Sequence, residues 1–387
     1  MRSSGGNNEK PHILFVSPVG ELGGAEQVAL SYARLLPQKN YQVSLALLRP
    51  GKLEHIAREQ GIEVHVFPKE YRFRDLASVV RSVLWLCALV KSQKVDLLHA
   101  NHASHFIANL AARLSRIKQI WHLYDYPYEW DPIDQVNRRF SADFNIYMTE
   151  KTRSGYVNQA KIPSAIISPD CVDVKAIQQI PKDRSTRTRY DLGAAPYFLT
   201  VARLQEHKGH SYLIDAAKQV ATHRSDVLWL IVGKASGIEQ DRYLSTLLEQ
   251  VRKQGLEQRV RFLGFVDDNN LASLRQEALA LVHPATSEGY GLVLIEAMAA
   301  GTPVIAAAAD GPKEIIQDRN NGLLVPVRDP MALGAAMICL LENETLRQTL
   351  IAGGYQYSET HNAETMLENT CRVYERLLAS PITSAPA

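Results

Sequence analysis

The sequence has 387 residues, 46% of them hydrophobic and 22% charged, which is typical of a soluble globular protein and excludes a disordered or fibrous one. Its length favours two domains, because a single hydrophobic core rarely extends beyond about 250–300 residues. The formal net charge of +2 conceals an asymmetry, with 21 Lys and Arg against 15 Asp and Glu in residues 1–165 and 22 against 26 in the remainder.

The chain begins with a polar segment, residues 1–11, which has no apolar core and is not expected to be a signal peptide. Short apolar runs rich in β-branched and aromatic residues then alternate with helical patterns such as GAEQVALSYARLL (24–36). The strands expected in this first series are HILFVSP (12–18), YQVSLALL (41–48), GIEVHVF (61–67), VDLLHAN (95–101), QIWHLYD (119–125) and ADFNIYMT (142–149).

A polar, basic segment follows, and its composition predicts a linker over residues 181–195. The second series of expected strands is PYFLTVAR (196–203), DVLWLIVG (226–233), RVRFLGF (259–265), ALALVHP (278–284), TPVIAAAA (302–309) and NGLLVP (321–326). We therefore expect one domain over residues 10–180 and another over 196–358, with a C-terminal helix over 359–380 that returns toward the first domain.

Strand–helix alternation of this kind predicts an α/β fold in which two doubly wound, Rossmann-like parallel-sheet domains face a central cleft. In such sheets ligands bind beyond the carboxyl ends of the strands, where the loops lead into the helices. The loops at those ends are therefore the places to look for a site.

Three of these loops carry candidate residues. Gly23 and Gly24 precede the first helix, where free backbone N–H groups favour an anion, although an ordinary tight turn explains them equally well. Their spacing differs from Gly-x-Gly-x-x-Gly, which disfavours NAD. Arg203 and Lys208 follow the first strand of the second series and together suit a diphosphate, unless both are merely solvated.

The third loop is TSEGYG (286–291), which leads into a helix that Gly301 ends. Glu288 lies in the loop, and Glu296 lies one to two turns inside the helix. Carboxylates so placed accept hydrogen bonds from ligand hydroxyls beside an anion-binding helix N-terminus, which fits a sugar nucleotide. The alternative is structural, with Glu288 as a capping charge and Glu296 as a solvated helix residue.

Glu288 and Glu296 together resemble the Glu-x7-Glu signature of the retaining GT-B glycosyltransferases of family four. The segments GGAE, VARLQEHKG, LIVGKASG, VRFLGFVDDNNL, EGYGLVLIEAMAAGTPVIA, GPKEII and NGLLVP occur in the order found in that family. The resemblance extends over residues 11–380. It implies that the first domain holds the acceptor and the second binds the donor nucleotide.

The resemblance also implies roles for individual residues. Arg203 and Lys208 would bind the donor diphosphate. Glu288 would contact the transferred sugar, and Glu296 the ribose. Gly23 and Gly24 would line the junction of donor and acceptor. The remaining donor-loop residues expected to line the site are Gly289, Tyr290, Gly291 and Leu292.

His122 matches a histidine that faces the anomeric centre in this family, and with Glu288 it is the expected catalytic residue. His102 is second in rank among the nearby histidines, which include His99 and His105, and a histidine packed at a strand end is the structural alternative. Asp310 departs from the Gly-Gly common in the family and lies near the donor loops, so it is a further candidate for sugar selection.

The expected reaction is transfer of a sugar, a hexose by preference, from a nucleoside diphosphate to a hydroxyl of a glycan, a lipid-linked sugar or a small metabolite. The resemblance implies that the transfer retains the anomeric configuration. The nucleotide sugar is a co-substrate, and neither a cofactor nor a metal is expected, since no Asp-x-Asp is present. The alternatives are a non-catalytic nucleotide-sugar-binding partner, and an epimerase or a phosphorylase on the same fold.

The chain is expected in the cytoplasm. The longest wholly apolar run, residues 83–90, is too short to span a bilayer, and the four cysteines lack metal-ligand spacing. The basic first domain suits an anionic partner or a solvated surface, and nothing points to a nucleic acid. The helical pattern over 71–91 suits either the inner face of a membrane or a packed core.

Overall fold

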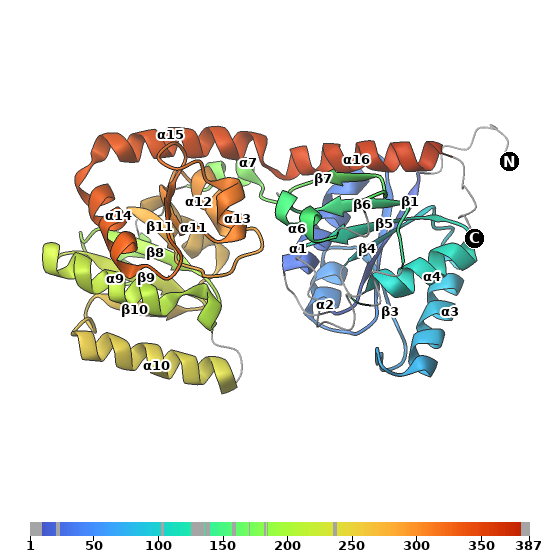
Figure 1. Ribbon diagram of the computed structural model, residues 1–387, viewed down its shortest axis with the longest axis horizontal. Helices are drawn as coiled ribbons and strands as arrows, with labels where there is room; N and C mark the ends of the chain where they lie inside the picture. The colour runs from blue at the N-terminus through green and yellow to red at the C-terminus, as the bar shows by residue number, and fades with distance from the viewer. Residues whose placement is uncertain are drawn as a thin grey trace. The chain divides into compact units, whose positions relative to one another are not determined.

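The computed structural model describes residues 10–20, 24–101, 104–124, 135, 140–156, 160–169, 171–181, 183, 185–234 and 238–380. The chain divides into two compact units (Figure 1). The first unit consists of Met1–Cys171 together with Glu364–Ala387, and the second unit is Val172–Ala363.

The first unit is built on a parallel sheet of seven strands in the order β3-β2-β1-β4-β5-β6-β7. The strands are β1 (His12–Ser17), β2 (Gln42–Leu47), β3 (Glu63–Val66), β4 (Leu97–Asn101), β5 (Lys118–Leu123), β6 (Phe144–Tyr147) and β7 (Ser164–Ile166). Its helices are α1 (Gly24–Leu35), α2 (Lys52–Glu59), α3 (Leu76–Ser92), α4 (His105–Ser115), α6 (Glu150–Gly155) and α16 (Ala363–Ala379), with the 3-10 helix η1 (Leu36–Lys39).

The second unit repeats the plan with a parallel sheet of six strands in the order β10-β9-β8-β11-β12-β13. The strands are β8 (Tyr197–Val201), β9 (Leu228–Val232), β10 (Val260–Gly264), β11 (Ala280–His283), β12 (Val304–Ala307) and β13 (Leu323–Val325). Its helices are α7 (Val174–Gln179), α8 (Ser185–Arg189), α9 (His210–His223), α10 (Ile238–Gln254), α11 (Asp268–Glu277), α12 (Leu292–Ala299), α13 (Asp310–Ile315), α14 (Pro330–Glu342) and α15 (Glu344–Thr360), with the 3-10 helix η4 (Glu206–Lys208).

The second sheet is buried on both faces, which explains why its strands are nearly continuous apolar runs. Along β9, Trp229 and Ile231 pack into the core beneath α9, α10 and α14, whereas Leu228 and Leu230 pack on the opposite side with Leu274 of α11. Since alternate strand residues face opposite sides, every residue of β9 serves one of two cores.

The expected α/β class and parallel sheets are confirmed, and each of the twelve expected strand segments contains a strand. β7 was not expected, because its three residues are exposed or half-buried and carry no apolar pattern. The polar segment 181–195 contains α8 and lies within the second unit. There Arg187 donates to the carbonyl oxygens of Gly193 and Ala195 and pairs with Glu277 at 3.2 Å.

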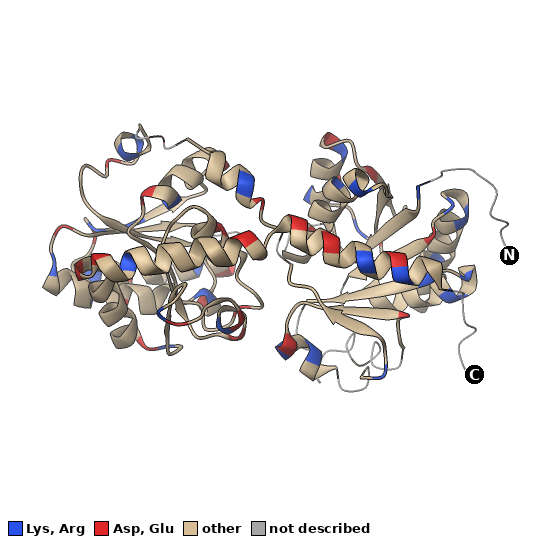
Figure 2. Ribbon diagram, turned by 90° about the horizontal axis from the view of Figure 1, so that it is seen from above, with Lys and Arg blue, Asp and Glu red and all other residues tan. Residues whose placement is uncertain are grey.

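The last helix, α16, belongs to the first unit although the whole second unit precedes it in the chain. Its inner face buries apolar residues and Tyr374, and Thr370 bonds to the hydroxyl of Tyr32 at 2.8 Å. Its outer face carries the acidic and basic bands visible along this helix in Figure 2, and its exposed charged residues are Glu364, Glu368, Arg372, Glu375 and Arg376.

Both strand orders reverse direction at one point, between β1 and β4 in the first sheet and between β8 and β11 in the second. Open α/β sheets bind their ligands at such switch points, beyond the carboxyl ends of the strands. The loops after β8 and β11 carry Arg203, Lys208 and Glu288, so the fold brings these expected site residues to one edge of the second sheet.

Candidate functional site

The loops that follow β8 and β11 are packed directly on each other. Gly209 has a φ of +74°, and a Cβ there would lie 2.0 Å from the carbonyl oxygen of Pro284. The backbone N–H of Thr286 donates to the carbonyl oxygen of His207 at 2.8 Å. Only glycine combines this left-handed backbone with so close an approach, which fixes the loops carrying Lys208 and Glu288 against each other.

Glu288 is the centre of a charged cluster in this edge. Lys208 Nζ lies 2.7 Å and His283 Nε2 lies 2.9 Å from the same oxygen, Glu288 Oε2. The three side chains are largely shielded, with exposed fractions of 13% for Lys208, 16% for Glu288 and 2% for His283. The carboxylate is therefore held in one orientation by two partners, one from the loop after β8 and one from the end of β11.

The electrostatics of the cluster keep Glu288 ionised. Burial acts most strongly and would raise the pKa of the carboxyl, but the hydrogen bond and charge of His283 and the charge and hydrogen bond of Lys208 together outweigh it. The pKa falls from 4.5 to about 2. Glu288 is thus a fixed acceptor of hydrogen bonds at neutral pH and has no proton to donate.

Helix α12 begins beside this carboxylate. Gly291 precedes its first residue with a φ of +109° and gives the helix no side-chain cap, so the end of α12 retains backbone N–H groups for an anion. Gly289 is exposed, Tyr290 is buried and Leu292 is half-buried. Gly289, Tyr290 and Gly291 form the short turn between Glu288 and the helix, and Leu292 is the first residue of the helix.

Glu296 lies inside α12 and is paired with a buried arginine. Arg275 Nη2, from α11, lies 2.6 Å from Glu296 Oε2, and the exposed fractions are 7% for Arg275 and 35% for Glu296. Arg275 Nε has no hydrogen-bond partner among the described residues. The arginine orients one oxygen of Glu296, so the ribose expected here would meet a carboxylate already held in place.

Helix α13 closes the other side of the turn. The N–H of Gly311 donates to the carbonyl oxygen of Glu288 at 3.0 Å, and a Cβ on Gly311 would lie 2.3 Å from the carbonyl oxygen of Tyr290. Asp310, the first residue of α13, is exposed beside this contact. A residue expected to influence sugar selection thus adjoins the loop that carries Glu288.

Arg203 follows β8 and is exposed, and its side chain forms no hydrogen bond or ion pair with any described residue. The backbone beside it is closely packed, because a Cβ on Gly233 would lie 1.8 Å from the carbonyl oxygen of Ala202. Its guanidinium is near enough to His207 to help lower the pKa of that histidine, after burial and Lys208. Arg203 therefore offers an uncommitted cation at the same edge as Lys208.

In the first unit, His122 lies near the end of β5 and is fully buried. Its Nδ1 lies 3.1 Å from His99 Nε2, its ring stacks on Tyr124 at 4.2 Å, and its Nε2 has no partner among the described residues. Burial, reinforced by His99, lowers the pKa of His122 well below its usual range. His122 is therefore neutral at pH 7.

The other histidines of this region differ in their roles. His105 stacks on Trp121 and its Nε2 lies 3.2 Å from two backbone carbonyl oxygens, which is a structural position. His102 and Gly23 lie outside the described residues. Gly24 is the exposed first residue of α1, and a Cβ there would meet nothing within 4 Å, so lack of space does not require glycine at that position.

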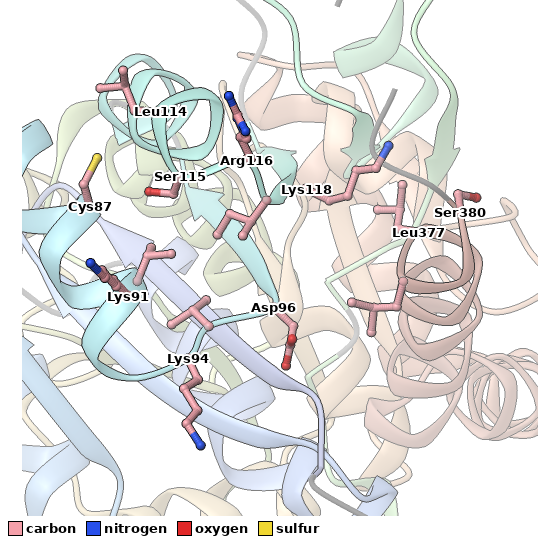
Figure 3. A pocket seen from close by; sticks show the side chains of 14 residues that line it. Cys87, Lys91, Lys94, Asp96, Leu114, Ser115, Arg116, Lys118, Leu377 and Ser380 are labelled. Atoms are coloured by element: carbon pink, nitrogen blue, oxygen red, sulfur yellow. The ribbon is translucent and has the colours of Figure 1, made fainter. Parts of the chain in front are cut away.

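A basic hollow of about 740 Å³ opens at the amino ends of β4 and β5 in the first unit. Figure 3 shows Lys91 from the end of α3, Arg116 from the end of α4 and Lys118 at the start of β5 around it. Helix α3 also exposes apolar side chains at four-residue spacing, with exposed fractions of 77% for Leu76, 48% for Val80 and 60% for Leu84. None of the described helices combines the length and hydropathy needed to cross a bilayer.

Two partners in the site were not found from the sequence. His283 ends β11 five residues before Glu288, and a histidine closing an apolar strand just ahead of a site loop was a usable signal. Arg275 lies 21 residues before Glu296 on another helix, so only the tertiary fold connects the two.

Comparison with known proteins agrees with this architecture. The family model described as Glycosyltransferase Family 4 matches residues 22–169, and the model described as Glycosyl transferases group 1 matches residues 185–357. A phosphatidyl-myo-inositol mannosyltransferase of Mycobacterium leprae (strain TN) is 34% identical over 220 residues, covering 56% of this chain and 54% of that protein. A D-inositol 3-phosphate glycosyltransferase of Nocardioides sp. (strain ATCC BAA-499 / JS614) is 33% identical over 210 residues, covering 51% and 46%.

The chain spans about half the length of these curated relatives. Among solved structures, Anabaena Alr3699/HepE in complex with UDP and glucose matches with a TM-score of 0.80 at 22% identity, over 95% of this chain and 100% of that one. Sucrose-phosphate synthase from Thermosynechococcus elongatus matches with a TM-score of 0.77 at 22% identity, over 96% and 100%. With two family models matching consecutive parts that make up most of its length, and with a GT-B fold, the chain belongs to the family-four type of glycosyltransferases.

Proposed function

We propose that this protein transfers a hexosyl group from a nucleoside diphosphate sugar to a hydroxyl acceptor with retention of anomeric configuration. The observation that carries the proposal is the cluster of Lys208, Glu288 and His283 beside the uncapped start of α12. It combines a cation and free N–H groups for a diphosphate with an ionised carboxylate for sugar hydroxyls.

The chemistry follows from where charge develops. As the bond from C1 to the diphosphate oxygen breaks, negative charge grows on the phosphate, and Arg203, Lys208 and the N–H groups of α12 are placed to stabilise it. The acceptor oxygen forms its bond to C1 on the same face, and its proton passes to the departing phosphate oxygen. Glu288 accepts hydrogen bonds from the sugar, and Glu296 accepts them from the ribose.

The relatives support this class of reaction. The names of the two curated relatives describe transfer of a sugar to an inositol-based acceptor, and Alr3699/HepE was solved with UDP and glucose. For this chain we propose a glycan, lipid-linked or small-molecule hydroxyl as acceptor, and UDP is the first nucleotide to test. The Arg203 and Lys208 cations supply charge that a metal supplies in other transferases.

The test is thermal stability of the full chain with UDP, GDP, ADP, dTDP and NAD at about millimolar concentration. A nucleotide at 100 times its dissociation constant stabilises the native state by about 2.7 kcal/mol. We expect a shift with one nucleoside diphosphate, a loss of that shift in Arg203→Ala and no shift with NAD. Absence of any shift would contradict the proposal.

Three alternatives make different predictions. A phosphorylase requires inorganic phosphate, and an epimerase converts the donor with no acceptor present. A non-catalytic partner binds the nucleotide without turnover. Measuring donor consumption with and without acceptor and phosphate separates all three from a transferase, and the anomeric configuration of the product tests retention.

We also propose that the first unit contacts an anionic membrane surface. Leu76, Val80 and Leu84 form an exposed apolar stripe on α3, and Lys91 and Arg116 border the adjoining hollow. An apolar stripe beside cations is complementary to the acyl chains and headgroups of anionic lipids. A second copy of the chain would bring like charges together, which disfavours it as the occupant.

A further inference from the structure

A chain of three buried polar side chains crosses the first unit from its last helix to β5. Tyr374 Oη, on α16, lies 2.6 Å from His99 Nδ1, and His99 Nε2 lies 3.1 Å from His122 Nδ1. All three residues are 0% exposed. The chain ends on His122 Nε2, which has no partner among the described residues.

Both imidazoles in this chain are neutral. Burial, with His105 adding to it, lowers the pKa of His99 to about 3, and burial lowers the pKa of His122 well below its usual range. Each neutral ring carries one N–H and one lone pair. The contact between the two rings requires one N–H and one lone pair. All donors in the series Tyr374–His99–His122 must therefore point toward His122, or all must point toward Tyr374.

The hydroxyl of Tyr374 decides the direction. Its only described hydrogen-bond partner is His99 Nδ1, and burial raises the pKa of Tyr374 well above its usual value, so the phenol keeps its proton. If the O–H donates to His99 Nδ1, then His99 Nε2–H donates to His122 Nδ1, and His122 carries its own proton on Nε2. The opposite direction leaves the O–H of Tyr374 buried without an acceptor, which is unfavourable.

We propose that Tyr374, acting through His99, holds His122 in the Nε2–H tautomer, so that His122 donates a hydrogen bond to an oxygen of the substrate and does not act as a base. Tyr374 and His99 are positioning residues in this scheme. The role of His122 toward substrate rests on the proposed function, whereas its tautomer does not. The scheme agrees with transfer of the acceptor proton to the departing phosphate oxygen, because no basic nitrogen is left on His122 to take it.

The tautomer is measured directly by 15N NMR of the full chain labelled at histidine, without substrate. We expect His122 to carry its proton on Nε2 in the wild type. Tyr374→Phe removes only the hydroxyl and should move part of the His122 population to Nδ1–H. Tyr41→Phe is the matched control, because Tyr41 packs edge-on against Tyr374 at 5.6 Å and lies outside the hydrogen-bonded chain.

A rescue variant distinguishes the hydrogen-bonding role of His99 from its role in packing. In His99→Gln the amide oxygen accepts from Tyr374 and the NH₂ donates to His122 Nδ1, so the Nε2–H tautomer should persist, whereas His99→Leu should lose it. An Nδ1–H tautomer in the wild type, or a tautomer unchanged in Tyr374→Phe and His99→Leu, would overturn the inference.

Transfer kinetics test the role toward substrate. Tyr374→Phe should lower kcat about tenfold with the KM for donor unchanged, and His122→Ala should cost about 10²–10³ in kcat, as loss of one catalytic hydrogen-bond donor does. Full activity in His122→Ala, with nucleotide binding intact, would refute the role of His122 and leave the transferase proposal standing. Failure of every nucleotide to bind would instead refute the proposed function and leave the tautomer result intact.

Discussion

Lys208 Nζ donates to Glu288 Oε2 at 2.7 Å although 80 residues separate the two in the chain. The contact leaves Lys208 largely shielded, with an exposed fraction of 13%, at the edge where the loops after β8 and β11 meet. The lysine is thus held in position before any ligand arrives, which lowers the entropic cost of placing its charge against a phosphate.

Replacing this lysine should weaken binding of the donor. Lys208→Met removes the charge while keeping most of the apolar stem, and a hydrogen bond to a charged group contributes about 1.5–3 kcal/mol, so the dissociation constant of the nucleoside diphosphate should rise about 10- to 150-fold. Isothermal titration calorimetry measures the change. Lys218→Met is the control, because among the described residues Lys218 bonds only to the carbonyl oxygen of Gln254, at an exposed position. Equal affinities in both variants would contradict the assignment.

The stability of the second unit should depend on the ionisation of Glu288. Its pKa falls from 4.5 to about 2 on folding, so the unfolded chain binds this proton more readily than the native one. The stabilisation is therefore complete above pH 4.5 and is lost as the pH falls toward 2, by an amount on the order of 3 kcal/mol. Urea unfolding of wild type and Glu288→Gln at several pH values should show a difference that shrinks over this window, and a constant difference would show that the pKa is not depressed.

Gly209→Ala should destabilise the second unit more than a left-handed backbone alone explains. Gly209 and Gly255 have φ values of +74° and +67°, but a Cβ on Gly209 would meet Pro284 whereas one on Gly255 would meet nothing within 4 Å. Gly255→Ala should cost about 1–2 kcal/mol, the penalty of the left-handed conformation. Gly209→Ala should cost clearly more and weaken nucleotide binding, and equal melting temperatures for the two variants would be the opposite result.

The side chains of Arg275 and Glu296 should act together, so that changing either one affects the other. Glu296→Gln removes an acceptor expected to bind ribose and also leaves the buried guanidinium of Arg275 without its carboxylate, so it should lower both donor affinity and stability. Arg275→Met keeps Glu296 but frees it to move. A smaller loss of affinity in Arg275→Met than in Glu296→Gln would indicate direct contact of Glu296 with the donor, and unchanged affinity in both would remove Glu296 from the site.

Binding to lipid vesicles should depend on the face of α3. With vesicles of phosphatidylcholine and phosphatidylglycerol, Leu84→Glu should reduce co-sedimentation by placing a charge in the apolar stripe. Added salt should weaken vesicle binding by the wild-type protein, because it screens Lys91 and Arg116. Leu248→Glu is the matched control, because Leu248 is 49% exposed in the second unit. Equal binding of the wild type and both variants would contradict a membrane contact through α3. Equal binding of the wild type to anionic vesicles and to vesicles of neutral lipid alone would contradict it as well.

The fold could be predicted from the sequence because local signals repeat along it. The apolar strand runs are separated by helical periodicity, which indicates parallel sheets, and the expected strands are all present. The exception, β7, is a short edge strand whose residues carry too little apolar pattern to be recognised. An edge strand pairs with a neighbour on one side only, so its sequence is less constrained than that of a central strand.

The candidate site was only partly predictable. Lys208 and Glu288 were expected at the same sheet edge because each follows a strand directly, and the structure places them in contact. Arg275 reaches Glu296 from a neighbouring helix, and Tyr374 reaches His99 across 275 residues of sequence, distances over which no local pattern carries information. Which ring nitrogen of each buried histidine carries the proton is likewise set by its neighbours in the folded chain.

Because α16 supplies Thr370 and Tyr374 to the first unit, that unit cannot finish folding until the second unit has been synthesised. At about 5–20 residues per second, the ribosome needs on the order of 10–40 s to make Val172–Ala363 before the helix follows. During that interval Tyr32, Tyr41 and His99 lack the face they pack against. The nascent first unit therefore keeps apolar surface exposed until the second unit and then α16 have been synthesised.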